Sequence, residues 1–329
     1  MSAVRLDSQK SLIPFVPLYR VAIALKNAAY DRHWIEAKQL QWPVVSIGNL
    51  SVGGSGKTPL VIHLAQLLSA KNIPVNVLSR GYGRSSVNVA RVNPSGSAED
   101  FGDEPLLIAR KAGVPVYVGA SRYEAGLLAE REAAGPGIHI LDDGFQHRKL
   151  SRSMDIVVVH RSDFEQQLLP AGRLREPLSS LHRASAVVLR AEDADLETRL
   201  RHGGVRVPIW IQQRKLLVEP CGPAIAFSGI GRPEEFTSAL RAAGVEVLAV
   251  RAFRDHHRYT DADIDSILQL ARSVGAQACV TTEKDAMRLD ARHHEKLSSA
   301  LHLQLARLEV SLANEAAIVE RIAQLLVRK

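Results

Sequence analysis

The chain has 329 residues and a formal net charge of +7 at pH 7; 46% of its residues are hydrophobic and 23% are charged. These values are typical of a soluble globular protein with one large or two ordinary domains. The positive charge favours an anionic partner, such as a nucleotide, a phosphorylated substrate or an anionic membrane surface. No zinc-finger spacing or RNA-binding aromatic motif occurs, so we do not expect nucleic acid as a partner.

The N-terminal segment predicts an amphipathic helix and excludes a secretory signal or a membrane span. Residues 12–25 are apolar, but Pro14, Pro17 and Arg20 interrupt them, so this stretch is too short and too broken to cross a bilayer. From Pro17 onward, apolar residues recur on one helical face. Two interpretations are open from these residues alone: the face packs on the domain, or it lies in a membrane surface.

A glycine-rich segment follows an apolar run at 44–47 and precedes a helix predicted at 59–68. A strand, a glycine-rich turn and a helix in this order are the setting of a phosphate-binding loop (P-loop), whose backbone N–H groups surround phosphate oxygens. We therefore predict a nucleotide site at Ser51, Val52, Gly53, Gly54, Ser55, Gly56, Lys57 and Thr58.

Two side chains of this loop have predicted roles of their own. Lys57 is expected to reach the outer phosphates, and the Thr58 hydroxyl is expected to bind Mg²⁺. The general motif has glycine at the first position, where this chain has Ser51. The loop does not reveal whether the phosphoryl group passes to water, to a protein or to a small molecule.

Apolar strands alternate with helices over the next 130 residues. Continuous apolar runs of this kind are typical of parallel strands that are buried on both faces. The fold class is therefore α/β, with a P-loop NTPase-like, mostly parallel sheet flanked by helices. The strands are predicted at 75–80, 114–118, 138–142, 154–159 and 186–189, and the helices at 106–112 and 122–133.

Charged residues stand where these elements begin or end. Asp142 and Asp143 end a strand, the position at which P-loop proteins place a carboxylate for Mg²⁺. Asp103 precedes the helix at 106–112, where it either complements the helix dipole or lies near the transferred phosphate. Arg175 lies in a loop and suits a bidentate phosphate contact, the alternative being a structural ion pair with Glu176.

The pattern changes near residue 206. Two short alternating segments, at 209–211 and 215–218, predict a two-stranded linker over residues 206–220. We expect a first domain at 1–205 and a smaller α/β domain at 221–329, whose last helix could pack back on the first domain. The strands and helices of the smaller domain are predicted at 224–227, 233–243, 245–250, 261 onward, 278–282, 303–308 and 314–327.

Two motifs of the smaller domain have weak interpretations on their own. His256 and His257 are adjacent and lack a third ligand at a fixed spacing, so we do not expect a metal there. The segment 282–285, Thr-Glu-Lys-Asp, contains the residues of a guanine-reading motif in the wrong order. This favours ATP over GTP.

Taken together, six segments resemble the tetraacyldisaccharide 4′-kinases, the lipid A kinases of Gram-negative bacteria. Ser51 fits this family, which has a small hydroxyl residue at that position. The resemblance runs from the N-terminal helix to about Asp290, and it rests on the segments 48–59, 79–83, 102–105, 142–147, 172–176 and 253–256.

The resemblance implies ATP- and Mg²⁺-dependent transfer of the γ-phosphate to the 4′-hydroxyl of a tetraacyldisaccharide 1-phosphate, the lipid A precursor, giving lipid IVA. It implies a peripheral protein on the cytoplasmic face of the inner membrane, with the N-terminal helix in the membrane surface. We expect no obligate protein partner. The alternative function is a regulatory P-loop switch, an ATPase or GTPase without a lipid substrate, which would give Asp103 and His256 no role.

The resemblance also implies roles for individual residues. Asp103 would take the proton of the 4′-hydroxyl with the help of His256, while Lys57 would neutralise phosphate charge. Asp142 would bind Mg²⁺ together with Thr58. Because Asp103 and His256 come from different predicted domains, we expect a cleft to close during turnover. The residues expected near the lipid substrate are Asp143, Gln146, His147, Arg175 and Glu176.

Overall fold

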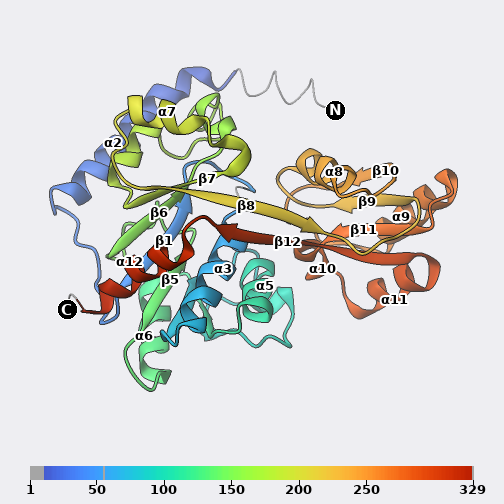
Figure 1. Ribbon diagram of the computed structural model, residues 1–329, viewed down its shortest axis with the longest axis horizontal. Helices are drawn as coiled ribbons and strands as arrows, with labels where there is room; N and C mark the ends of the chain where they lie inside the picture. The colour runs from blue at the N-terminus through green and yellow to red at the C-terminus, as the bar shows by residue number, and fades with distance from the viewer. Residues whose placement is uncertain (1–10, 55, 328–329) are drawn as a thin grey trace.

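Residues 11–54 and 56–327 are described from a computed structural model, which has two lobes joined by a pair of long strands (Figure 1). The first lobe comprises residues 11–207 and the C-terminal helix, and the second lobe comprises residues 221–301. The two long strands are β8 (Ile209–Leu217) and β12 (His302–Leu312), which we call the ribbon. Ser55 of the predicted P-loop lies outside the described residues.

A twelve-stranded sheet passes through both lobes in the order β10-β9-β11-β12-β8-β7-β6-β1-β5-β2-β4-β3. In the first lobe, β1 lies between β5 and β6 and pairs with both in parallel. The other strands are β1 (Val44–Asn49), β2 (Val75–Ser79), β3 (Ala90–Arg91), β4 (Val116–Val118), β5 (Ile138–Asp142), β6 (Met154–Val158), β7 (Ala186–Arg190), β9 (Ala224–Ser228), β10 (Val247–Ala252) and β11 (Ala278–Thr282).

The central strands of the first lobe confirm the predicted fold class. Every residue of β1, β2, β5, β6 and β7 is buried, because helices cover both faces of this part of the sheet. The helices that follow the N-terminal 3₁₀ turn η1 (Ile13–Phe15) are α2 (Val16–Asp31), α3 (Lys57–Ala70), α4 (Ala98–Phe101), α5 (Asp103–Ala112), α6 (Arg122–Glu132), α7 (Leu196–His202), α8 (Pro233–Ala242), α9 (Asp261–Val274), α10 (Glu283–Ala286), α11 (Ala291–Ala300) and α12 (Glu315–Val327). Three further 3₁₀ turns are η2 (Arg161–Phe164), η3 (Leu178–Arg183) and η4 (Ala191–Asp193).

Two strands join the lobes, as predicted, but they do not both come from residues 206–220. The prediction of two short strands within 206–220 was wrong, because this segment contains the single strand β8. Its first residues pair with β7 and its last residues pair antiparallel with β12, so the polar residues in its middle continue the strand. The second strand of the ribbon therefore comes from residues 302–312. The boundaries 1–205, 206–220 and 221–329 stay a prediction.

The last helix returns to the first lobe (Figure 1). Three apolar side chains of α12, those of Ile318, Val319 and Ile322, belong to the core that also contains α3 and the central strands. At the start of α12, Glu315 Oε1 lies 2.7 Å from His63 Nε2 of α3. The chain thus passes from the first lobe to the second along β8 and comes back along β12, which gives the lobes two covalent connections.

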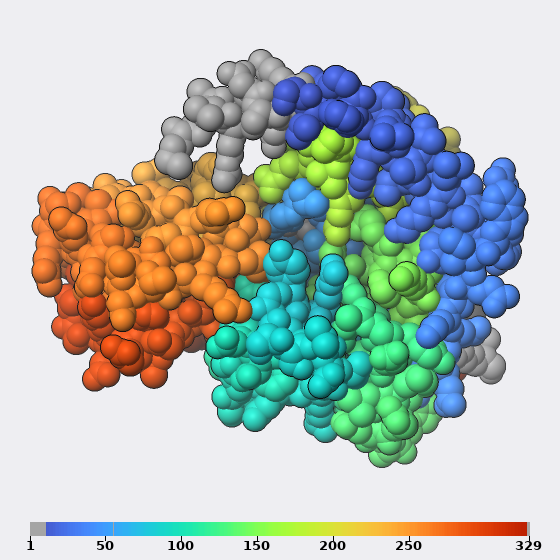
Figure 2. Space-filling model, turned by 180° about the vertical axis from the view of Figure 1, so that it is seen from behind, coloured from blue at the N-terminus to red at the C-terminus, as the bar shows by residue number. Residues whose placement is uncertain are grey.

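Helix α2 lies on the surface of the first lobe (Figure 2) and exposes apolar side chains. Leu18 is 70% exposed and Leu25 is 66% exposed, values that a core-packed face would not have. Among residues 11–54 and 56–327, no helix combines the length and the apolar character needed to span a bilayer. We call the following exposed residues the apolar patch: Leu12, Ile13, Phe15, Leu18, Val21 and Leu25.

Candidate active site

The P-loop joins the carboxyl end of β1 to the first turn of α3, as the sequence predicts. Gly53 and Gly56 have φ angles of +87° and +77°, a backbone conformation that favours glycine. Lys57 Nζ donates a hydrogen bond to Asn49 Oδ1 at 2.7 Å and lies 3.3 Å from Asp143 Oδ1. The loop therefore curls with its lysine directed toward the acidic end of β5.

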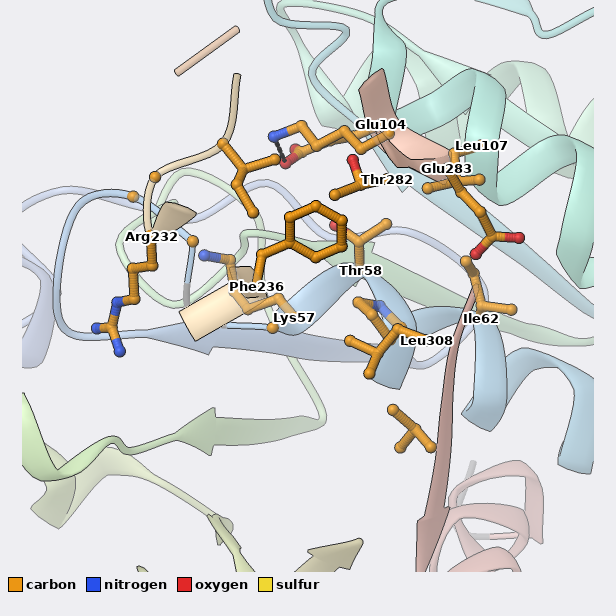
Figure 3. A pocket seen from close by; sticks show the side chains of 18 of the residues that line it. Lys57, Thr58, Ile62, Glu104, Leu107, Arg232, Phe236, Thr282, Glu283 and Leu308 are labelled. Atoms are coloured by element: carbon orange, nitrogen blue, oxygen red, sulfur yellow. Dashed lines mark hydrogen bonds and ion pairs between the residues drawn. The ribbon is translucent and has the colours of Figure 1, made fainter. Parts of the chain in front are cut away.

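A cavity of about 1500 Å³ lies between the lobes at the P-loop. Its lining comes from the P-loop, the carboxyl ends of β2 and β5, the start of α5, the ribbon and the loops of the second lobe, and Figure 3 shows side chains of both lobes around it. The lobes also touch directly, because a Cβ added to Gly231 would lie 2.7 Å from Gly54 N. A cavity of this size, at the carboxyl ends of parallel strands, can hold a nucleotide and part of a second substrate.

Asp142 ends β5 and faces this cavity with Thr58. The Ser79 hydroxyl donates a hydrogen bond to Asp142 Oδ2 at 3.0 Å. Burial, together with the nearby carboxylates of Glu104 and Asp143, raises the pKa of Asp142 to about 7. A divalent cation would offset this concentration of negative charge, so the oxygen donors here fit Mg²⁺.

The protein would supply only part of the coordination of such an ion. Among the residues that the structure describes, no group of three or more His, Cys, Asp or Glu side chains is arranged to hold a metal. Mg²⁺ in kinases commonly takes its remaining ligands from phosphate oxygens and water, because it dehydrates reluctantly. A hydroxyl and one or two carboxylates are therefore a sufficient protein contribution.

Asp143 is held by two cations. It has a φ of 50°, a left-handed conformation that is rare outside glycine. Arg175 donates hydrogen bonds from Nη1 to Asp143 Oδ2 at 2.9 Å and from Nη2 to Asp143 Oδ1 at 2.8 Å, a bidentate contact. Burial opposes ionisation of Asp143, but Lys57 and Arg175 outweigh it and hold the pKa of this carboxyl well below its ordinary value.

Asp103 and His256 meet across the interface between the lobes. Asp103 is the first residue of α5, is 5% exposed, and its Oδ2 lies 3.0 Å from His256 Nδ1. Burial alone would raise the pKa of Asp103, but the hydrogen bond with His256 and the charges of Lys284 and Arg288 bring it down to about 2. His256 has a φ of 58°, a strained conformation of the kind that clusters at functional sites.

The other residues expected near the lipid substrate lie outside the cavity lining, close to α2. Gln146 Nε2 donates to the backbone oxygen of Asn49 at 2.9 Å, and Glu176 Oε2 accepts a hydrogen bond from Asn27 Nδ2 at 3.0 Å. Burial, followed by the charge of Arg122, lowers the pKa of His147 to about 4. Gln146 and Glu176 therefore connect the site to its surroundings, whereas Lys57, Thr58, Asp142, Asp143, Arg175 and His256 line the cavity.

The sequence does not predict several of the positively charged side chains that line the cavity. Arg214 lies on β8, and its Cζ is 3.9 Å from the position that a Cβ on Gly56 would take. Burial and the charge of Arg190 lower the pKa of Arg214 to about 10, and its buried Nε has no hydrogen-bond partner among the described residues. Arg214 stands in a polar stretch without a motif, so only its position in the fold reveals it. Lys284 also lines the cavity, although its segment suggested only a misordered guanine motif.

Comparisons with known proteins place the chain in one family. A family model described as tetraacyldisaccharide-1-P 4′-kinase matches residues 8–327. The tetraacyldisaccharide 4′-kinase of Koribacter versatilis is 42% identical over an alignment 328 residues long, and the match covers 96% of this chain and 99% of that protein. The one from Aquifex aeolicus is 39% identical over an alignment 274 residues long, and the match covers 77% of this chain and 84% of that protein.

A solved structure agrees with these sequence matches. The crystal structure of LpxK from Aquifex aeolicus in complex with ATP is similar with a TM-score of 0.76 and 34% sequence identity. The match covers 96% of this chain and 99% of that chain. The resemblance found in the six sequence segments is thereby confirmed, and the chain belongs to the tetraacyldisaccharide-1-P 4′-kinase family.

Proposed function

We propose that this protein transfers the γ-phosphate of ATP to the 4′-hydroxyl of a tetraacyldisaccharide 1-phosphate, giving lipid IVA. The observation that carries the proposal is the position of the P-loop and the Asp103–His256 pair at one interlobe cavity, in a chain of this family. A regulatory nucleotide switch would leave the pair without a role, and the family matches favour the kinase.

The P-loop amides and Lys57 bind the phosphates of ATP. The bidentate contact with Arg175 holds the carboxylate of Asp143 in place beside Lys57. Mg²⁺ held by Thr58 and Asp142 would neutralise charge on the ATP phosphates. In a loose phosphoryl-transfer transition state most of the work is positioning and charge neutralisation, so these groups contribute most of the catalysis.

The proton of the 4′-hydroxyl passes to the Asp103–His256 pair. Asp103 is a weak base, but the proton leaves late in a loose transition state, so a weak base suffices. His256 lines the cavity, and Asp103 lies behind it on the Nδ1 side of the ring. The two residues thus accept the proton as a pair, with His256 at the cavity wall and Asp103 hydrogen-bonded to it from behind, and they can do this only while the lobes are together.

Helix α2 binds the cytoplasmic face of the inner membrane through the apolar patch. Its other face is fixed to the loop that carries Arg175, because the Tyr19 hydroxyl donates to the backbone oxygen of Arg175 at 3.0 Å. Lys26 Nζ on the same helix contacts the backbone oxygen of Gln146 at 3.3 Å. This attachment supports the proposal, because a membrane bound to α2 would lie next to the loops that flank the cavity, where an acylated acceptor would enter.

The experiment is to incubate the purified protein with ATP, Mg²⁺ and the disaccharide 1-phosphate lipid in detergent, and to measure both phosphorylated lipid and free phosphate. We expect a lipid product that carries one additional phosphate and forms in step with ADP. Hydrolysis of ATP that is independent of lipid, without any lipid product, would support the nucleotide switch instead.

A further inference from the structure

The helix α10 joins the two lobes through its charged side chains. Thr282 caps this one-turn helix, and the two residues that follow reach α5 of the first lobe. Glu283 Oε2 lies 2.8 Å from Lys111 Nζ, and Lys284 Nζ donates to Glu104 Oε1 at 2.9 Å. The segment that suggests a misordered guanine motif is therefore an interlobe contact.

A buried carboxylate anchors α10 within the second lobe. Asp285 of α10 is fully buried and accepts hydrogen bonds from Gly229 N at 2.8 Å and from the Tyr259 hydroxyl at 2.8 Å. One turn later, Arg288 donates from Nη1 to the backbone oxygens of Gly229 and His257, at 3.0 and 3.1 Å. The guanidinium of Arg288 is therefore attached to the backbone of the second lobe through Nη1.

The partner of Arg288 in the first lobe is Asp103. Arg288 Nε lies 3.2 Å from Asp103 Oδ2, and both side chains are 5% exposed. Lys284 Nζ lies 4.0 Å from the same oxygen and 3.3 Å from His256 Nε2. A buried carboxylate without such cations would carry a large desolvation penalty.

Among the residues that the structure describes, the charged groups around Asp103 can each be assigned to a lobe. His256, Lys284 and Arg288 come from the second lobe, and so does Asp255, whose Oδ1 lies 3.9 Å from Lys284 Nζ. From its own lobe, Asp103 receives a hydrogen bond from the backbone N–H of the adjacent Glu104, whose carboxylate pairs with Lys284. The cations that compensate the charge of Asp103 are thus supplied across the interface.

We propose that Lys284 and Arg288 are positioning residues, which hold the Asp103 carboxylate toward His256 only while the lobes are closed. This inference rests on the proposed phosphate transfer and on the role of the Asp103–His256 pair in it. When the cleft opens, Asp103 loses its cations and its partner imidazole together. Proton acceptance is thereby confined to the closed enzyme, in which an acceptor hydroxyl is enclosed with ATP.

The test compares Arg288→Met, Arg288→Lys and Lys284→Met with the wild type, by measuring formation of phosphorylated lipid against pH. We expect Arg288→Met to lower kcat roughly 10- to 100-fold with little change in the KM for ATP, because the carboxylate loses its orientation. The acid limb of the kcat profile should move up by about one to three pH units, because a compensating cation near the carboxylate is gone. Lys284→Met should move it in the same direction, and Arg288→Lys should restore part of the shift.

Arg292 provides the matched control, because it is an exposed arginine on the neighbouring helix α11. Arg292→Met should leave kcat and the acid limb unchanged. A folded Arg288→Met protein whose acid limb coincides with that of the wild type would overturn the proposal, even if its rate is low, since a structural role would lower the rate alone. If Arg288→Met does not fold, the acid limbs of Lys284→Met and Arg288→Lys test the proposal instead, and acid limbs that coincide with that of the wild type would overturn it. Absence of lipid product from the wild type would instead refute the proposed function.

Discussion

Replacing Arg214 should stabilise the nucleotide-free protein but weaken its binding of ATP. Its side chain lies beside Gly56 of the P-loop, and within residues 11–54 and 56–327 its buried Nε has no hydrogen-bond partner and no ion pair joins it to another side chain. A buried and unsatisfied donor costs roughly 1–3 kcal/mol. We therefore expect Arg214→Gln to raise the thermal stability of the nucleotide-free protein, although most substitutions of partly buried residues lower stability.

The same substitution should weaken ATP binding. A hydrogen bond to a charged group contributes about 1.5–3 kcal/mol, so the loss of a guanidinium–phosphate contact should raise the KM for ATP by roughly 10- to 150-fold. Burial and the neighbouring Arg190 already lower the pKa of Arg214, which means that an added anion would relieve an unfavourable charge. The binding energy of the nucleotide thus offsets a cost that the free protein carries.

Thermal melting with and without ATP measures both effects in one assay. The Arg214→Gln variant should melt at a higher temperature than the wild type without ATP, and should gain less from saturating ATP. Lys215 is the matched control, because it is the next residue of β8 and is exposed; Lys215→Gln should change neither value. If Arg214→Gln lowers the melting temperature of the free protein and leaves the KM for ATP unchanged, Arg214 has no role at the phosphates.

Three further predictions concern other parts of the site. Asp103→Ala should lower kcat far more than it raises either KM, because the carboxylate acts on the transferred proton; steady-state kinetics with an unchanged kcat would remove it from the reaction. His147 has a folded-state pKa of about 4, below its unfolded value, so the wild type should lose stability as the pH falls from about 6.5 to 4, and His147→Gln should lose less in urea titrations. Leu18→Glu together with Leu25→Glu should reduce sedimentation with vesicles of phosphatidylethanolamine and phosphatidylglycerol, while activity on a detergent-dispersed lipid stays near that of the wild type; equal sedimentation would refute the membrane role of the apolar patch.

The parts of the site that follow from local sequence could be predicted. The residues of a P-loop are consecutive in the sequence. Asp142 is recognisable because an acid at the end of a buried strand lies at the edge of the sheet. Asp103 was harder to interpret, since an acid at a helix start also suits the helix dipole. Its burial beside His256 excludes a purely exposed capping role.

The parts that depend on distant pairing could not be predicted. The ribbon pairs residues 212–217 with residues 307–312, and no local pattern records such a partner. The polar residues in the middle of β8 interrupt the alternation that identifies a strand, so one strand looked like two. Lys284, Arg288 and Arg214 acquire their importance only from the approach of the second lobe and the ribbon to the P-loop and Asp103.

The most direct test of the account follows the fate of the γ-phosphate. Protein, Mg²⁺ and ATP labelled in the γ-phosphate are incubated with the disaccharide 1-phosphate lipid, and the labelled lipid is analysed for the position of the new phosphate. We predict label on the 4′-oxygen of the lipid, and none on the lipid when Lys57→Met replaces the wild type. Label that appears only as inorganic phosphate, or on another oxygen of the sugar, would contradict the proposed function.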